Sequence, residues 1–119
     1  MSEITQQGYD EIINYIMTNW KIIKFYDAGN NLKLSYNISQ EQRIGVSKNE
    51  GKIIITALLK GSDSDISPLL PLTLSRIALF KENSNDAMIF ETFNPVTINS
   101  TNDVFYFKLE IQVPQEGGN

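Results

Sequence analysis

Cysteine and histidine are both absent from this chain of 119 residues. Without them no disulfide can cross-link the fold, and no thiolate or imidazole can bind a metal ion. The same absence excludes cysteine proteases, Ser-His-Asp hydrolases, zinc enzymes and acid–base catalysis by histidine. Basic residues are also few, since 10 lysines and arginines stand against 14 aspartates and glutamates. The net charge of −4 argues against a nucleic-acid partner, for which a basic surface is expected.

Long apolar segments are missing as well. The uninterrupted apolar runs, such as 53–55, 57–59 and the four residues 77–80, fall far short of the ~20 residues of a membrane span. The opening residues, MSEITQQGYDE, have neither the basic start nor the apolar run of a secretory signal. We therefore expect a chain made in the cytoplasm, with no membrane partner.

Charged residues make up only 20% of the chain, and Asn, Ser, Thr and Gln take their place. Removing water from such a surface costs less free energy than removing it from a surface of Lys and Glu. The cores of protein interfaces are depleted in charge in the same way. An AT-rich genome, which favours Ile, Asn and Lys codons, is a second and compatible interpretation.

A helical period is clear only in residues 4–20. Its apolar side chains recur at the spacing of one helix face: Tyr9, Ile12, Ile13, Ile16, Met17 and Trp20. Thr5 precedes them as the expected N-cap, with its hydroxyl accepting from the backbone N–H of Gln7 or Gly8. The apolar stripe requires a covering layer, because monomers seldom expose one of this size.

From residue 21 the period changes to two, which predicts strands. Residues 21–27 and 32–38 form a predicted hairpin around the Asp, Gly and Asn residues between them. Residues 43–48 and 52–60 form a second hairpin around Asn49-Glu50-Gly51. Both faces of 52–60 are apolar, so this strand is expected to be central in its sheet.

The second half of the chain continues as strands. They are predicted at 72–81, 87–93, 96–98 and 103–113, with Pro95 separating the second from the third. The fold class is therefore α+β, with one N-terminal amphipathic helix packed on a mostly antiparallel β-sheet or small β-sandwich of about six to eight strands. Residues 1–113 form one predicted domain, and residues 114–119 a flexible C-terminal tail.

Acidic residues are the candidates for metal binding and catalysis. Asp63 and Asp65 are weak metal candidates, because their loop lacks the later glycine and the bidentate glutamate of an EF-hand, and a solvated turn is the favoured interpretation. Carboxylates for a glycosidase-type pair exist, but no spacing pairs them: Asp10, Glu11, Asp27, Glu91 and Glu110. With no nucleophile elbow and no phosphate-binding glycine loop, we expect a protein without catalytic activity, metal or cofactor.

Aromatic and polar side chains supply the candidate contact surface. Trp20 and Phe25 are assigned to the core beneath the helix. The last strand has a polar face that either meets solvent or contacts another subunit. The candidate interface residues are Tyr26, Tyr36, Tyr106, Lys108 and Gln112. A carbohydrate-binding module that stacks Trp20 and these tyrosines on host-surface glycans is the alternative function.

The order of features resembles the N-terminal domains of phage tail-fibre and related tail or baseplate proteins. In that group a T-x-x-G stretch leads an amphipathic helix, as in Thr5-Gln6-Gln7-Gly8 followed by 9–20. A strand and an Asp/Gly/Asn turn follow, here 21–31. The phrase Ser75-Arg76-Ile77-Ala78-Leu79-Phe80, the polar turn at 81–86 and the strand at 87–93 resemble the later part of the family's pattern.

The resemblance covers most of the chain, but it departs from the family in two places. The glycine-rich G-D-G after the first strand is reduced to Asp27-Ala28-Gly29, and no fibre shaft or receptor-binding tip follows. The resemblance implies a stand-alone virion protein of a tail fibre, baseplate, collar or head-attached adaptor. It implies assembly with other virion proteins and as a homo-oligomer, and it carries over no catalytic residue.

Overall fold

The protein, a computed structural model in which residues 3–113 are described, is one helix packed on two antiparallel sheets. The predicted tail at 114–119 lies outside the described residues. The elements in chain order are α1 (Gln6–Asn19), β1 (Ile22–Tyr26), β2 (Leu32–Asn37), η1 (Ile38–Gln40), β3 (Ile44–Asn49), β4 (Lys52–Lys60), η2 (Ser67–Leu69), β5 (Leu72–Phe80), β6 (Ala87–Ile98) and β7 (Val104–Gln112). The α+β fold class expected from the sequence is confirmed.

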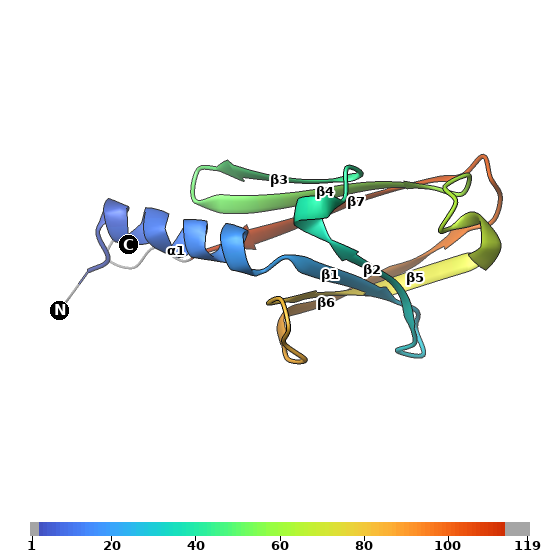
Figure 1. The fold of residues 1–119 in the computed structure, drawn as a ribbon, viewed down its shortest axis with the longest axis horizontal. Coiled ribbons are helices and arrows are strands. Elements are labelled where there is room, and N and C mark those ends of the chain that lie inside the picture. Colours follow the sequence, from blue (N-terminus) through green and yellow to red (C-terminus); the bar gives the residue numbers. More distant parts are fainter. Residues whose placement is uncertain (1–2, 114–119) are drawn as a thin grey trace.

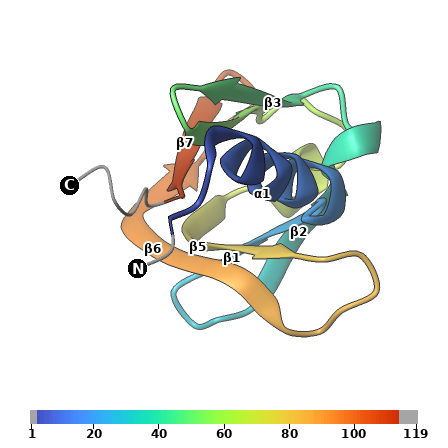
Figure 2. The same ribbon diagram turned by 90° about the vertical axis from the view of Figure 1, so that its left-hand side faces the viewer.

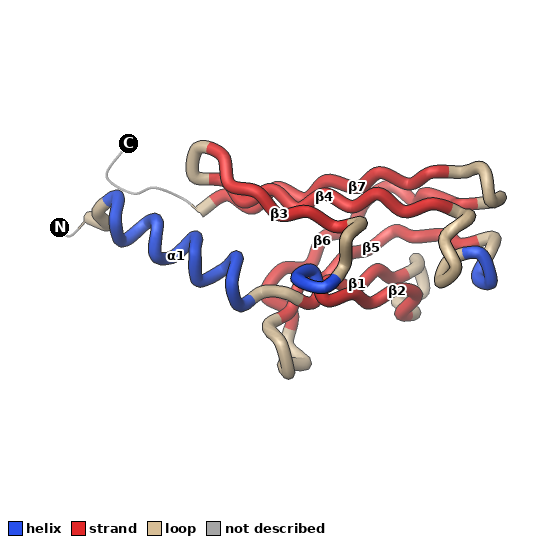
Figure 3. Tube along the Cα trace, turned by 45° about the horizontal axis from the view of Figure 1, so that its top comes forward, coloured by secondary structure: helices blue, strands red, loops and turns tan. Residues whose placement is uncertain are grey.

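The two sheets lie face to face as a sandwich. One has the strand order β2-β1-β5-β6 and the other the order β3-β4-β7 (Figure 1). The helix α1 continues the long axis at one end, so the molecule measures 54 × 28 × 27 Å. Figure 2, which looks along this axis, shows α1 in front of the gap between the sheets, and Figure 3 shows how far it reaches beyond their ends.

The helix begins and ends as its sequence predicts. The Thr5 hydroxyl accepts from the backbone N–H of Gly8 at 3.1 Å, which confirms the predicted N-cap. Tyr9, Ile13 and Ile16 are buried against the sheets. Ile12, which the sequence places on the same stripe, is instead 37% exposed, because the helix inserts only one narrow side into the end of the sandwich.

Both predicted hairpins are present. In the first, β1 pairs with β2, and the Asp27 carboxylate accepts from the backbone N–H groups of Gly29 and Asn31 at 2.9 Å. In the second, β3 pairs with β4 through a turn in which Glu50 and Gly51 have φ values of 50° and 78°. Such left-handed residues match the twist of a tight hairpin. As predicted, β4 is the central strand of its sheet.

Four phenylalanine rings pack together between the sheets. Phe25 of β1 meets Phe105 and Phe107 of β7 edge-on, with ring centroids 6.1 and 5.6 Å apart. Phe93 of β6 lies against the same two rings. Edge-to-face pairs of this kind add stabilisation beyond their buried area. The placement of Phe25 in the core is thus confirmed.

The expected break at Pro95 is wrong. Residues 87–98 form one continuous strand, β6, which pairs with β5 on both sides of Pro95. Between the Leu74–Val96 and Arg76–Thr92 pairs, β5 has one residue and β6 has three, so β6 itself bulges at residues 93–95. Proline is tolerated there because β6 is an edge strand and the bulge requires no ladder N–H from it.

Among residues 3–113, no helix is long and apolar enough to cross a membrane.

Candidate assembly surfaces

The outer face of the three-stranded sheet exposes apolar side chains at one end. Tyr106 of β7 lies directly opposite Leu58 of β4, and Val104 stands two residues away on the same face. Their side chains are 57%, 45% and 58% exposed, respectively. We call Leu58, Val104 and Tyr106 the β7 patch. Contiguous exposed apolar patches are uncommon on the surfaces of monomeric proteins, and where they occur they indicate contact sites.

The other end of that face is charged. Lys108 pairs with Glu110 at 3.1 Å, and Lys52 of β4 approaches the same carboxylate at 3.8 Å. The hydrogen bond from Lys108 holds the pKa of Glu110 below its usual range. Gln112 follows on the same face and is exposed. Three of the predicted interface residues therefore share one outer face, because β7 alternates strictly between core and solvent.

The outer face of the four-stranded sheet is different in character. We define the cation–aromatic face as Lys24 and Tyr26 of β1, Arg76 and Phe80 of β5, and Phe90 of β6, which strand pairing places on one side of the sheet. Phe80 is buried within this face, at 6% exposed. The Lys24 ammonium lies 4.7 Å from the centre of the Phe80 ring, and the Arg76 guanidinium lies 5.8 Å from that of Phe90.

The two cations of this face are not neutralised by neighbours. Among residues 3–113 neither Lys24 nor Arg76 forms an ion pair, and Arg76 reaches only the side-chain oxygen of Asn30 at 3.3 Å. Phe90 is 54% exposed. Arginine and aromatic residues are the types that most often dominate interface energetics. A chain with net charge −4 thus has a positively charged, aromatic face on one side.

The strand β6 adds an open edge to this face. It is the outermost strand of its sheet and, within the described part of the chain, pairs only with β5. Met88 and Val96 are exposed along it, at 36% and 38%. An exposed edge of this kind presents backbone N–H and C=O groups to a further strand, although Pro95 supplies no donor.

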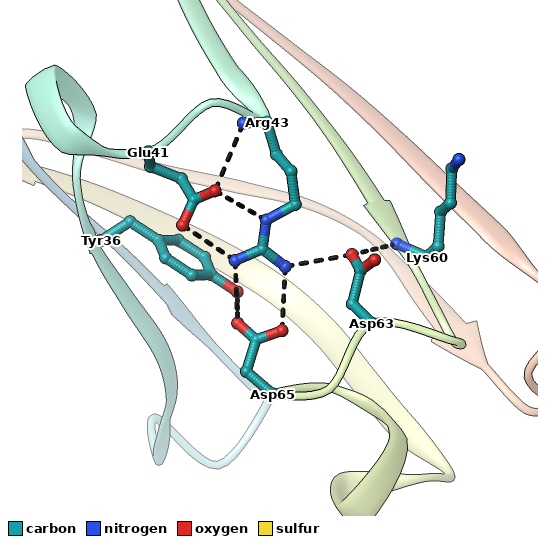
Figure 4. A network of polar contacts seen from close by, with 6 residues as sticks. All are labelled: Tyr36, Glu41, Arg43, Lys60, Asp63 and Asp65. Carbon is teal, nitrogen blue, oxygen red and sulfur yellow. Dashed lines mark hydrogen bonds and ion pairs between the residues drawn. The ribbon is translucent and has the colours of Figure 1, made fainter.

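A polar network joins the two sheets from the side (Figure 4). The Arg43 guanidinium, just before β3, binds Glu41 through Nε at 2.8 Å and Nη2 at 2.9 Å. It binds Asp65 through Nη1 at 2.8 Å and Nη2 at 3.0 Å, and Asp63 through Nη1 at 3.0 Å. The Tyr36 ring of β2 lies under the guanidinium at 5.0 Å and donates its hydroxyl to Asp65 at 2.8 Å. We call these five residues the Arg43 network.

The electrostatics of the network follow from its one central cation. Hydrogen bonds from Arg43 lower the pKa of Glu41 and of Asp65. Burial, followed by the hydrogen bond to Asp65, raises the pKa of Tyr36. Asp63 and Asp65, the weak metal candidates, are therefore already held by a guanidinium. Within the described part of the chain, no three Asp or Glu residues are placed to hold a metal ion.

The candidate residues do not converge on one site. Tyr36 belongs to the Arg43 network and Trp20 packs against the core. Tyr26 and Tyr106 lie on the outer faces of different sheets. These four aromatics therefore form no single row on which a sugar would stack.

The carboxylates considered for catalysis are spread over the fold. They occupy α1, the β1–β2 turn, β6 and β7: Asp10, Glu11, Asp27, Glu91 and Glu110. The pKa of Asp27, like that of Glu110, is lowered, in its case first by the backbone hydrogen bond of Asn31. A general acid needs the opposite shift.

Several surface residues were missed by sequence reasoning. Phe90 and Arg76 lie on strands whose pairing is not visible in the sequence, and Leu58 was read as part of a two-sided core strand. Pro95 was a usable signal, since proline within a strand indicates a sheet edge.

Comparison with known proteins gives no match. No protein-family model, curated protein or solved structure matches the chain.

Proposed function

We propose that this chain is a non-enzymatic virion structural protein, of a bacteriophage tail fibre, baseplate, collar or head-attached adaptor, that acts by binding copies of itself and neighbouring virion proteins. The observation that carries the proposal is the presence of exposed apolar and aromatic surface on two opposite sides of one sandwich. The β7 patch lies on one side and the cation–aromatic face on the other.

Two unlike surfaces on opposite sides support head-to-tail contacts. A contact between unlike surfaces generates a ring when the rotation closes and an open stack when it does not. Tyr106 presents an aromatic ring to which the unpaired Arg76 of a second copy is suited, because guanidinium groups stack on aromatic faces. The positively charged face also suits an acidic surface on a different virion protein.

The test uses two single variants, Tyr106→Glu and Phe90→Glu. Both side chains are more than half exposed, so the fold should tolerate the change. Each variant should weaken self-association by about thirtyfold or more, the effect of losing a strong interface anchor. Tyr15→Glu is the matched control, since Tyr15 is 51% exposed on α1, outside both surfaces.

Mixing the two variants gives the sharper result. If the contact is head-to-tail, each variant retains one intact surface, so an equimolar mixture should form heterodimers and nothing larger. Native mass spectrometry distinguishes these species by mass. A wild-type chain that stays monomeric at high concentration and binds no other virion protein would contradict the proposal. Self-association that both variants retain would place the contact elsewhere.

A further inference from the structure

An apolar cavity lies where α1 enters the sandwich. Its volume is about 230 Å³, and all but two of its lining residues are apolar. Ile16 and Trp20 line it from the helix, Leu79 from the four-stranded sheet, and Ile55 and Ile111 from the three-stranded sheet. The three layers of the fold therefore meet at this space without filling it.

Water finds few hydrogen-bond partners at the inner, apolar end of this space. A buried water needs two to four polar partners, which isoleucine, leucine and tryptophan side chains do not provide. Engineered protein cavities of ~150 Å³ with a similar apolar lining stay dry and bind benzene. The cavity described here is about one and a half times that size. It is thus suited to an apolar ligand.

The two polar lining residues define one end of the cavity. Ser39 is exposed and Lys21 is half-buried, so they mark the side that faces solvent. The Ser39 hydroxyl donates to the Asn37 side-chain oxygen at 2.6 Å. Lys21 forms no ion pair with any residue from 3 to 113. A lysine without an ion-pair partner in the lining of an apolar cavity is complementary to a ligand with an apolar body and an anionic head.

We propose that this cavity binds a medium-chain aliphatic carboxylate, with its chain between α1 and the two sheets and its carboxylate at Lys21. The volume sets the length of the chain. Scaled from the cavity of ~150 Å³ that holds the six carbons of benzene, the space takes roughly nine carbons. The proposed ligands are therefore carboxylates of about eight to ten carbons, and not long-chain lipids.

The first experiment titrates the unmodified chain with a series of carboxylates from hexanoate to dodecanoate, each below its micelle concentration. Trp20 is the one tryptophan of the chain and lines the cavity, so its fluorescence reports occupancy directly. Affinity should rise by about fourfold per added methylene, because each buried methylene contributes a similar free energy. The rise should stop near nine carbons, where the cavity is full.

Two variants and one neutral ligand test the assigned geometry. Lys21→Gln should weaken decanoate binding by about threefold, as expected for a partly exposed ion pair. It should leave decanol binding unchanged. Lys60→Gln is the matched control, because this exposed lysine lies at the far end of β4 (Figure 4). Val46→Phe, which fills the cavity from the edge strand β3, should abolish the response of Trp20 to decanoate.

Several outcomes would overturn the proposal. No change in Trp20 fluorescence with any member of the series means that the cavity takes no such ligand. Affinity that keeps rising through dodecanoate, or that survives in a folded Val46→Phe, means adsorption to the surface. If the wild-type chain binds no carboxylate and Val46→Phe no longer self-associates, the proposal is wrong and the cavity instead holds a side chain of a second copy. The length series on the unmodified protein decides the question even where Val46→Phe does not fold.

Discussion

Replacement of Arg43 by methionine should lower the free energy of unfolding by about 2–3 kcal/mol at neutral pH. Methionine keeps the length of the side chain but removes the only cation among three carboxylates. Glu41, Asp63 and Asp65 would then face one another without compensation, and Tyr36 would lose the guanidinium above its ring.

The magnitude follows from the exposure of the network. The Arg43 side chain is 25% exposed, those of Glu41 and Asp63 are 22% exposed, and that of Asp65 is 40% exposed. Fully exposed ion pairs contribute about 0–1 kcal/mol, whereas removal of one partner from a buried pair costs about 3–5 kcal/mol. Two bidentate contacts in a half-buried setting lie between these limits. For a domain of this size, the loss corresponds to about 10 °C in Tm.

The loss of stability in Arg43→Met should be larger at neutral pH than at acidic pH. Arg43 lowers the pKa of Glu41 and Asp65 from their ordinary values of 4.5 and 3.8. A carboxyl whose native pKa is lowered stabilises the fold above its unfolded pKa, and this stabilisation is lost as the pH falls through the native pKa. The difference between the wild type and Arg43→Met is therefore largest at neutral pH and should shrink below pH 4.5.

Chemical unfolding followed by circular dichroism at several pH values measures this difference. Arg76→Met is the matched control, because Arg76 is the only other arginine of the chain and, among residues 3–113, forms no ion pair but only the contacts with the Phe90 ring and the Asn30 side-chain oxygen. It should cost less than about 0.5 kcal/mol, as surface substitutions usually do. The reasoning would be refuted by equal losses in the two variants, or by a loss in Arg43→Met that is the same at pH 3 and pH 7.

Three further substitutions probe single contacts by the same unfolding assay. Gly61→Ala should cost about 3 kcal/mol or more and lower expression of folded protein, because the new Cβ would collide with the backbone carbonyl of Ser100; a loss below about 1 kcal/mol would show that the loop can move aside. Ser75→Ala should be neutral or stabilising by up to about 1 kcal/mol, because the buried Ser75 hydroxyl has no hydrogen-bond partner among residues 3–113, and a clear loss would reveal a missing partner. Tyr9→Phe should cost about 1 kcal/mol by removing the hydrogen bond to the Val113 carbonyl at 3.1 Å, and an unchanged midpoint would mean that this bond contributes nothing.

The features that sequence analysis predicted well are those set by neighbouring residues. The strict alternation of residues 104–112 follows from one buried and one exposed face of β7. The cap at Thr5 and the turn at Glu50-Gly51 depend on only a few adjacent positions. Each could be predicted because the physical cause lies within a few residues along the chain.

The features that were missed depend on contacts between distant segments. Pro95 was expected to break a strand, but a bulge in β6 opposite β5 accommodates it. Asp63 and Asp65 were read as a solvated turn, yet their cation is Arg43, which lies 20 and 22 positions earlier. The exposure of Phe90 and Leu58 likewise depends on which strands cover which face, and the periodicity of a single strand does not contain that information.

The position of the Arg43 network bears on the cavity beside it. The two sheets share no hydrogen-bonded strand, so their separation is fixed by core packing and by the connections that cross between them. The network ties β2 to the start of β3 and to the β4–β5 loop, and Ile38 and Ile44 on either side of Arg43 both line the cavity. Toward α1 the core is incomplete, because the apolar cavity opens to solvent there beside Ser39. A ligand that binds the folded chain and not the unfolded one stabilises the fold by mass action. An occupant of the cavity would therefore stabilise the fold at the end where α1 joins the sandwich, and the Arg43 network would hold the opposite wall of the cavity in place.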